Sequence, residues 1–292
     1  MKNFKTAMKR NFSPDKFLKA LIYFSLFIFH SSFIMPCSAS FHDTTLLVGS
    51  VPVDFRFPTV SSGAAILVLP GWNFSKSDVC VKSDFCAEAM NKGYILVLPE
   101  MLKSVYASVL FPETRNDWRR YPTMRWITDT LIPFCRDRFS ILKEGDKNFL
   151  YGISTGARGV ALVAENTGNL FLAGAALSGD YDQTSMTSDR LMIGYYGSCE
   201  LFRDRWQGPD NPCFHSDRLK IPLYIAHGSK DAVVPCQQSI AFSRKILSED
   251  PKRGHEFHVC DSCGHNYAFW NSQTAAVFRF FEKTGKIIPV KK

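Results

Sequence analysis

The sequence has no internal repeat, no low-complexity tract and no proline- or glycine-rich linker in its 292 residues. A fixed repeat is the signature of solenoids and propellers, so neither architecture is expected. Disordered chains are poor in apolar residues, whereas 46% of these residues are apolar. We therefore expect residues 40–292 to fold as a single domain.

Only one apolar run approaches the length of a membrane span, and it lies near the N-terminus. Basic residues precede the run Ala20–Met35, and the small residues "CSAS" follow it. A span needs about 20 apolar residues, and polar residues such as His30 interrupt this shorter run. The pattern is typical of a secretory signal peptide cut after Ala39 or Ser40. We interpret residues 1–39 as a signal peptide of a periplasmic or secreted protein, with an uncleaved membrane anchor as the alternative.

Little excess charge remains once this leader is set aside. The chain has a formal net charge of +8, and the leader holds six of its 35 basic residues and one of its 27 acidic residues. The remainder has 29 basic and 26 acidic residues, a net charge of +3, without a basic patch interleaved with aromatics. This balance argues against nucleic acid as a partner. Membrane contact is expected only if the leader is uncleaved.

The sequence also lacks the paired ligands of a zinc site, although it has nine cysteines. The Cys-x-x-Cys motif at 260–263 could be half of such a site, but no second motif or paired histidines lie at ligand spacing. We expect neither a metal nor an organic cofactor. Without Cys37, which leaves with the leader, the even set that remains is typical of up to four disulfides in an exported protein. The set is Cys80, Cys86, Cys135, Cys199, Cys213, Cys236, Cys260 and Cys263.

Short apolar runs alternate with helix-like segments along most of the chain. The runs end in Gly, Pro, Ser or Asp and are typical of buried parallel strands. They occupy residues 64–71, 94–100, 148–154, 170–180 and 221–231. This alternation predicts an α/β fold with a mostly parallel, doubly wound sheet covered by helices on both faces. Ahead of these runs, "TTLLVGSVPVDFRFP" alternates as an exposed antiparallel strand pair does.

Two long segments break the alternation, residues 101–122 and 181–217. Each follows a strand, so both should lie over the carboxyl edge of the sheet, where such folds bind ligands. Long aromatic loops at this place are often walls or lids of a site. Trp118, in the first segment, is therefore a candidate substrate contact.

The motif that carries chemistry is Gly152-Ile153-Ser154-Thr155-Gly156. A serine hydroxyl needs a base to take its proton, an acid that orients the base, and donors for the oxyanion. The α/β-hydrolases place this serine on a sharp turn between a strand and a helix. The apolar run before Ser154 and the glycines beside it favour such a turn. An ordinary serine in a glycine-rich bend is the alternative.

An acid and a base should follow in the order Ser, Asp or Glu, His. Asp231 ends the apolar run 221–231, and His265 precedes the last helix-like segment. The separations of 77 and 34 residues leave room for the intervening strands and helices. We therefore predict a catalytic triad of Ser154, His265 and Asp231.

Catalytic or binding roles are less strongly indicated for four other polar residues. Asp180 and Asp182 are alternative acids, although Asp180 is rather expected to shape the pocket and contact the substrate. His227 lies within a predicted strand and is expected to be structural. Arg158 should lie in the helix behind the serine, where a structural ion pair is favoured over substrate contact.

The disulfide partners cannot be deduced from the sequence alone. Their short separations favour Cys80 with Cys86, and Cys199 with Cys213. A further hypothesis joins Cys236 to the Cys-x-x-Cys motif at 260–263, which would tie the loop of the acid to the loop of the base.

At these motifs the sequence resembles the esterase family of α/β-hydrolases that includes esterase D, enterochelin esterases and mycolyltransferases. The matching stretches are "YGISTGARG", "ALSGDYD", "HGSKDAVVP" and "GHNYAFW", and the resemblance spans roughly residues 60–283. It implies an α/β-hydrolase fold with a serine nucleophile. The chain departs from the family at Ala157 and Arg158, where many members have Gly and His.

The oxyanion hole follows from the geometry of such folds. One donor is the backbone N–H of the residue after the nucleophile, here Thr155, and the other comes from the loop after an earlier strand. Trp72, directly after Gly71, is the candidate for the second donor, with Asn73 next. A role as pocket wall alone is the alternative for Trp72.

Together these features predict an exported serine esterase that cleaves small-molecule or glycan- or lipid-linked carboxylic esters through an acyl-enzyme. Acyl transfer, peptide cleavage and a non-catalytic binding role are the alternatives; the lack of a propeller or amine-anchoring domain in the sequence argues against an exopeptidase. A basic pH optimum is expected, because His265 must be neutral to act as a base.

Overall fold

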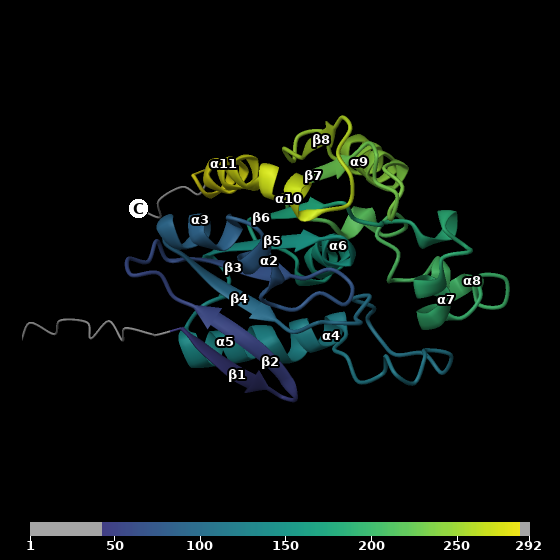
Figure 1. The fold of residues 1–292 in the computed structure, drawn as a ribbon, viewed down its shortest axis with the longest axis horizontal. Helices are drawn as coiled ribbons and strands as arrows, with labels where there is room; N and C mark the ends of the chain where they lie inside the picture. The colour runs from purple at the N-terminus through teal and green to yellow at the C-terminus, as the bar shows by residue number, and fades with distance from the viewer. Residues whose placement is uncertain (1–42, 287–292) are drawn as a thin grey trace, which may run out of the picture. The chain divides into compact units, whose positions relative to one another are not determined.

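The fold is one eight-stranded sheet with helices on both faces (Figure 1). The computed structural model describes residues 43–286. The strand order is β1-β2-β4-β3-β5-β6-β7-β8; β2 pairs antiparallel with β1 and β4, and the other neighbours are parallel. The predicted mostly parallel, doubly wound sheet is confirmed. The strands are β1 (Thr44–Val48), β2 (Val51–Arg56), β3 (Ala64–Leu69), β4 (Tyr94–Pro99), β5 (Lys147–Ile153), β6 (Ala173–Leu177), β7 (Leu223–Gly228) and β8 (Glu256–Cys260).

The five predicted apolar runs form the central strands because both of their faces are buried. Every residue of β3, β4, β6 and β7 is buried. Neighbouring residues serve opposite faces: Ile66 of β3 belongs to one hydrophobic core and Leu67 to the other. Strand β8 was not predicted, because it is a largely exposed edge strand without an apolar run.

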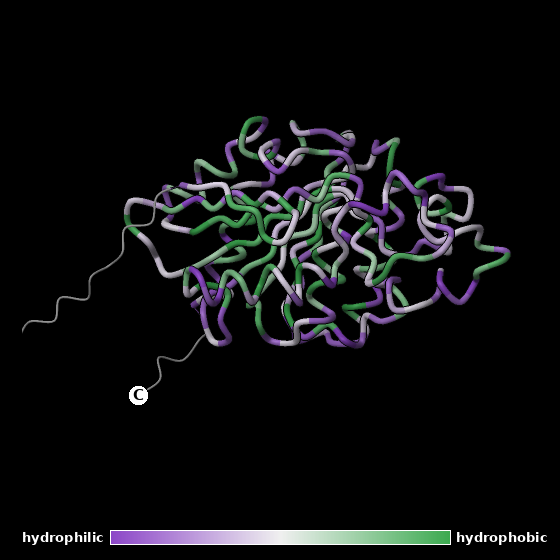
Figure 2. Tube along the Cα trace, turned by 90° about the horizontal axis from the view of Figure 1, so that it is seen from below, coloured by the Kyte–Doolittle hydropathy of each residue, from purple (hydrophilic) through white to green (hydrophobic). Residues whose placement is uncertain are grey.

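Helices cover both faces of the sheet. Ile132 of α5, Val160 of α6 and Phe242 of α9 belong to one core, whereas Phe85 of α3 and Phe278 of α11 belong to the other. Figure 2 shows the hydrophobic segments gathered in the middle of the molecule. The helices are α2 (Asp78–Lys82), α3 (Phe85–Asn91), α4 (Met124–Trp126), the π-helix η1 (Ile127–Leu131), α5 (Ile132–Phe139), α6 (Thr155–Thr167), η2 (Gln183–Ser185), α7 (Arg190–Tyr196), α8 (Arg203–Trp206), η3 (Ser216–Arg218), α9 (Gln237–Glu249), α10 (Tyr267–Ser272) and α11 (Thr274–Gly285).

The two long segments form one joint structure beyond the strand ends, at the right of Figure 1. The Arg115 N–H donates to the carbonyl oxygen of Gly194, and the Thr114 hydroxyl to that of Tyr195. We call their shared apolar cluster the cap core. It consists of Val105, Ala107, Trp118, Met192, Tyr195, Tyr196 and Trp206.

The predicted signal peptide lies outside the described residues and stays a prediction. Within residues 43–286 no helix has the length and apolar character that a membrane crossing requires.

Candidate active site

Ser154 lies on a strained turn between β5 and α6. Its φ of 55° and ψ of −127° are rare for a residue with a side chain and cost about 1–3 kcal/mol. The neighbouring glycines allow the turn: a Cβ on Gly152 would lie 2.2 Å from the carbonyl oxygen of Gly156, and one on Gly156 would lie 2.0 Å from that of Leu69. The turn therefore presents Ser154 at the carboxyl end of β5.

The structure brings Ser154, His265 and Asp231 together. The Ser154 Oγ lies 2.9 Å from His265 Nε2, and Asp231 Oδ2 lies 2.6 Å from His265 Nδ1. Because Nδ1 faces a carboxylate it carries a proton, so that Nε2 of the neutral ring can accept the hydroxyl proton. The ring packs edge-on against Trp270, with 5.1 Å between the ring centroids. One continuous hydrogen-bonded chain results.

The side chain of Asp231 is buried but well provided with donors. Its exposed fraction is 0%, and Oδ1 accepts the N–H groups of Val233 and Val234 at 2.9 and 2.8 Å. Burial alone would raise its pKa, but hydrogen bonds from His227, His265 and the Val234 N–H together hold the pKa well below its usual range. Asp231 therefore stays an anion beside His265 at neutral pH.

His227 contacts the same carboxylate, a contact that the sequence did not reveal. Its Nε2 lies 3.2 Å from Asp231 Oδ2 and 3.0 Å from the carbonyl oxygen of Val234, and its Nδ1 lies 2.7 Å from Ser239 Oγ. A carbonyl oxygen only accepts, so Nε2 carries the proton and Nδ1 accepts from the hydroxyl. The ring is completely buried. This histidine is thus structural and also fixes the candidate acid.

We expect His227→Leu to lower kcat on p-nitrophenyl butyrate about tenfold with little change in KM, because Asp231 loses a charge-assisted hydrogen bond that fixes its orientation. His258→Leu, at an exposed position of β8, is the matched control and should leave kcat unchanged. A folded His227→Leu variant with wild-type kcat would contradict the positioning role.

The two predicted oxyanion donors flank Ser154. Thr155 is the first residue of α6, and Trp72 follows Gly71 in the loop after β3. A Cβ on Gly71 would lie 3.0 Å from the Cβ of Ser154, so this loop passes directly beside the serine. In the described part of the chain, the N–H groups of Trp72 and Thr155 donate to no other protein group. Both are free to bind a ligand oxygen.

A pocket of about 310 Å³ opens at Ser154 and His265. It is lined by Trp72, Phe74, Ser154, Thr155, Asp180, Met186, Asp189, Leu191, Met192, Val233, Val234 and His265. Asp180, a predicted substrate contact, is therefore in the wall. Trp118, the other predicted contact, is not among these residues; its ring packs behind Trp72, with 4.6 Å between centroids, and is only 7% exposed.

Arg158 lies in α6 behind the serine turn and is completely buried. It forms the expected ion pair, at 3.1 Å, with Asp180. It also donates to the Tyr196 hydroxyl and to the carbonyl oxygen of Asp210, both in the 181–217 segment. The residue that departs from the esterase pattern thus joins the serine helix to that segment. The alternative acid Asp182 instead caps η2 through the N–H of Thr184.

Two disulfides are present among the described residues, Cys80–Cys86 and Cys260–Cys263. The first confirms the prediction from short separation. The predicted pair of Cys199 with Cys213 is wrong, and both are free. Cys213 is buried in the main core, whereas Cys199 packs against the cap core, so the two thiols belong to different packing layers.

The predicted bridge from Cys236 to the Cys-x-x-Cys motif is also wrong. Cys260 and Cys263 pair with each other, because the turn between them, with Ser262 at a φ of 63°, brings their Cα atoms to 5.5 Å. This disulfide turn still contacts the loop of Asp231, since the Lys230 N–H donates to the carbonyl oxygen of Cys263 at 2.9 Å. Backbone contact therefore joins the two loops where a covalent bridge was predicted.

We expect the paired substitution Cys260→Ser/Cys263→Ser to lower kcat about tenfold, because the turn that leads into His265 loses its restraint and small misplacements of catalytic groups are costly. Cys80→Ser/Cys86→Ser removes the other disulfide and is the matched control, with a lower melting temperature and an unchanged kcat. Equal effects of the two pairs on kcat would contradict this expectation.

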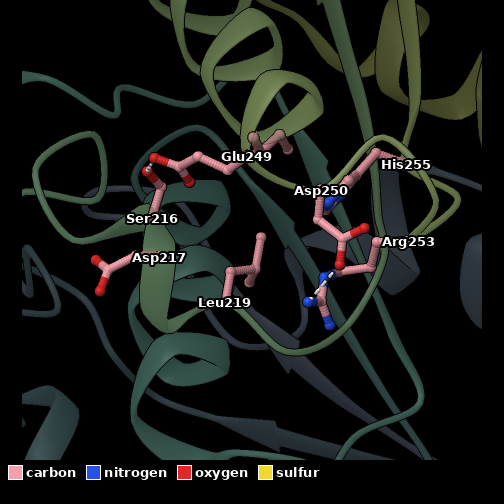
Figure 3. Close-up of a pocket in the computed structure, with 8 residues that line it drawn as sticks. Ser216, Asp217, Leu219, Glu249, Asp250, Arg253 and His255 are labelled. Atoms are coloured by element: carbon pink, nitrogen blue, oxygen red, sulfur yellow. Dashed lines mark hydrogen bonds and ion pairs between the residues drawn. The ribbon is translucent and has the colours of Figure 1, made fainter.

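A second pocket, of about 200 Å³, lies between η3 and α9 (Figure 3). Its polar side chains pair mainly with one another: the Ser216 hydroxyl donates to Glu249 at 2.9 Å, and Arg253 lies 2.6 Å from Asp250. Burial and nearby Arg253 lower the pKa of His255 to about 4, so its ring is neutral. In residues 43–286 no cluster of three or more His, Cys, Asp or Glu side chains is arranged for a metal ion.

A family model described as the prolyl oligopeptidase family matches residues 141–286, half of the chain. The chain belongs to the prolyl oligopeptidase family. The match includes Ser154, Asp231 and His265. No curated protein matches the sequence.

Solved structures of low sequence identity share the fold of this prolyl oligopeptidase family member. The fluorophosphonate-binding serine hydrolase F of Staphylococcus aureus has a TM-score of 0.63 at 16% identity, over 83% of this chain and 97% of that one. An S-formylglutathione hydrolase from Agrobacterium tumefaciens has a TM-score of 0.62 at 14% identity, over 83% of this chain and 94% of that one. An acylaminoacyl peptidase from Pyrococcus horikoshii has a TM-score of 0.62 at 16% identity, over 86% of this chain but only 43% of that one.

The family match, with the shared fold, establishes that this prolyl oligopeptidase family member is a serine hydrolase. The resemblance to the α/β-hydrolase esterases is confirmed.

Proposed function

We propose that the protein is an exported serine esterase in which Ser154 is the nucleophile, His265 the general base and acid, and Asp231 the orienting acid. The hydrogen-bonded chain from Ser154 through His265 to Asp231 is the observation that carries this proposal. Export is supported by the sequence of residues 1–39 and by two disulfides, which persist in oxidising compartments.

The proposed reaction has two halves. The Ser154 Oγ attacks the ester carbonyl carbon while His265 Nε2 takes the hydroxyl proton, and the N–H groups of Trp72 and Thr155 stabilise the resulting oxyanion. The intermediate collapses when His265 returns the proton to the leaving alcohol. Water, deprotonated by the same nitrogen, then hydrolyses the acyl-enzyme. Asp231 stabilises the imidazolium in both halves.

Small-molecule and glycan- or lipid-linked esters are the proposed substrates. The apolar wall of the pocket, with side chains such as Phe74, Met192 and Val234, suits an aliphatic or aromatic acyl or alcohol group. Peptide cleavage is the second candidate, because the family model is that of prolyl oligopeptidases. The same apparatus serves both reactions.

Fluorophosphonate labelling tests the nucleophile. We expect wild-type protein to be labelled at Ser154, and labelling to be lost in Ser154→Ala and retained in Ser248→Ala, an exposed serine of α9. p-Nitrophenyl esters of graded chain length, set against p-nitroanilides of the same acyl groups, then separate esterase from peptidase. Absence of labelling in folded wild-type protein would overturn the enzymatic proposal.

A further inference from the structure

We propose that Asp180 is an anionic anchor in the pocket at Ser154, and that it selects substrates carrying a primary ammonium group. This inference rests on the proposed function and adds a substrate class to it. The ammonium group belongs to the acyl or to the alcohol part of the ester, and the experiment below distinguishes the two.

The first support is the charge of the pocket wall. Asp180 and Asp189 contribute carboxylates, and no lysine or arginine is among the described residues that line the pocket. Lys82 lies 5.9 Å from the ring centroid of Phe74, but it is ion-paired with Asp78 at 2.9 Å. Arg158, behind the wall, offsets one of the two carboxylate charges, so the site keeps a net negative charge that repels an anionic substrate group and attracts a cation.

The second support is the hydrogen bonding of the two carboxylate oxygens of Asp180. Its side chain is only 5% exposed, and Oδ2 pairs with Arg158. Oδ1 accepts no hydrogen bond from another residue within residues 43–286. Besides Arg158, the carboxylate has a hydrogen bond only from the backbone N–H of Asp180 itself, so its lost hydration is compensated only in part. An ammonium N–H would supply a further donor as a charge-assisted hydrogen bond.

Asp189 is less suited to this role, although it lines the same pocket. Its Oδ1 accepts the N–H groups of Leu191 and Met192 at 2.8 and 2.9 Å, so it caps helix α7. The residue is half-buried, and water solvates its charge more fully. Asp180 is therefore the carboxylate that gains most from a bound cation.

The experiment compares esters of equal length that differ by one positive charge. In the acyl pair, p-nitrophenyl ω-aminocaproate has an ammonium group where p-nitrophenyl heptanoate has a methyl group. In the alcohol pair, ω-aminopentyl butyrate is matched with hexyl butyrate. We expect the kcat/KM of the wild-type protein to favour the ammonium ester of one pair by about tenfold or more, after division by each uncatalysed rate. The favoured pair locates the ammonium group.

The variants assign this preference to one carboxylate. We expect Asp180→Asn to reduce the ratio within the favoured pair to about one. Since this change leaves Arg158 buried without its partner, Arg158→Met/Asp180→Asn removes both charges and serves as the second variant. Asp189→Asn is the matched control, because asparagine also caps helices, and should keep most of the preference.

Each outcome decides one question. If the wild-type protein hydrolyses both neutral esters but favours neither ammonium ester, the Asp180 proposal is wrong and the proposed function stands. If the preference survives in both Asp180 variants and disappears in Asp189→Asn, the anchor is Asp189 and the proposal is wrong. If no ester is hydrolysed and fluorophosphonate labels nothing, the proposed function itself fails.

Discussion

Replacing Ser154 with alanine is expected to lower kcat by about four to six orders of magnitude, because the acyl-enzyme of the proposed mechanism can no longer form. Only binding and the oxyanion donors would remain to accelerate attack by water. The melting temperature should change little, since alanine keeps a Cβ and hence the backbone strain at a φ of 55°. Initial rates on p-nitrophenyl butyrate, with thermal unfolding of the same samples, measure both effects.

The matched control is Ser248→Ala, which should have wild-type kcat. Active-site titration with a fluorophosphonate excludes a trace of wild-type protein as the source of residual activity. A folded Ser154→Ala variant that keeps more than about one hundredth of the wild-type kcat would contradict the nucleophile assignment.

Replacing Asp231 with asparagine is expected to lower kcat by about three to four orders of magnitude without unfolding the protein. The N–H groups of Val233 and Val234 will keep the amide oxygen at the Oδ1 position. The amide NH₂ then takes the Oδ2 position, where it faces His265 Nδ1. A donor there forces Nδ1 to accept, so Nε2 becomes protonated and cannot take the hydroxyl proton.

The same NH₂ would also face the Nε2–H of His227, so two donors would meet and the loop would be less stable. Asp182→Asn, in which the residue caps η2 and does not contact His265, is the control and should keep the wild-type kcat. Near-normal kcat in Asp231→Asn, measured on p-nitrophenyl butyrate at several pH values, would exclude Asp231 as the orienting acid.

The depressed pKa of Asp231 also predicts how stability depends on pH. A carboxyl group whose pKa is lower in the folded state stabilises the fold above its unfolded pKa, which is about 4, and this stabilisation is lost as the pH falls towards the folded pKa. The difference in free energy of unfolding between wild type and Asp231→Asn should therefore be constant near neutrality and shrink below pH about 4. Urea titrations across this range measure it, and a constant difference would contradict the assignment.

The sequence predicted those parts of the fold that repeat a physical pattern. Both faces of the central strands are buried, so each run such as Leu223–Gly228 is continuously apolar and recognisable. The edge strand Glu256–Cys260 has no such pattern, because its position is set by pairing with β7 and not by its own burial. Chain order and glycine spacing were sufficient to predict that Ser154, Asp231 and His265 would lie together.

The rest of the site depends on contacts between distant segments, which sequence spacing does not encode. Trp118 was predicted in the pocket because of its loop, but it packs behind Trp72. The sequence predicted a structural role for His227, and its contact with Asp231 is visible only in the fold. A separation of 14 residues suggested Cys199 with Cys213, yet the chain between them passes through α8 and carries the two thiols into different cores.

The buried guanidinium of Arg158 limits how the protein admits its substrate. Swinging the 181–217 segment away from the sheet would separate this cation from the Tyr196 hydroxyl and the Asp210 carbonyl, and leave Asp180 as its remaining partner. Such a hinge motion is therefore unfavourable, and we expect the entrance to keep nearly the same shape when substrate binds. We therefore expect the chemical steps and product release through an open pocket to set the turnover rate, without a slow opening step.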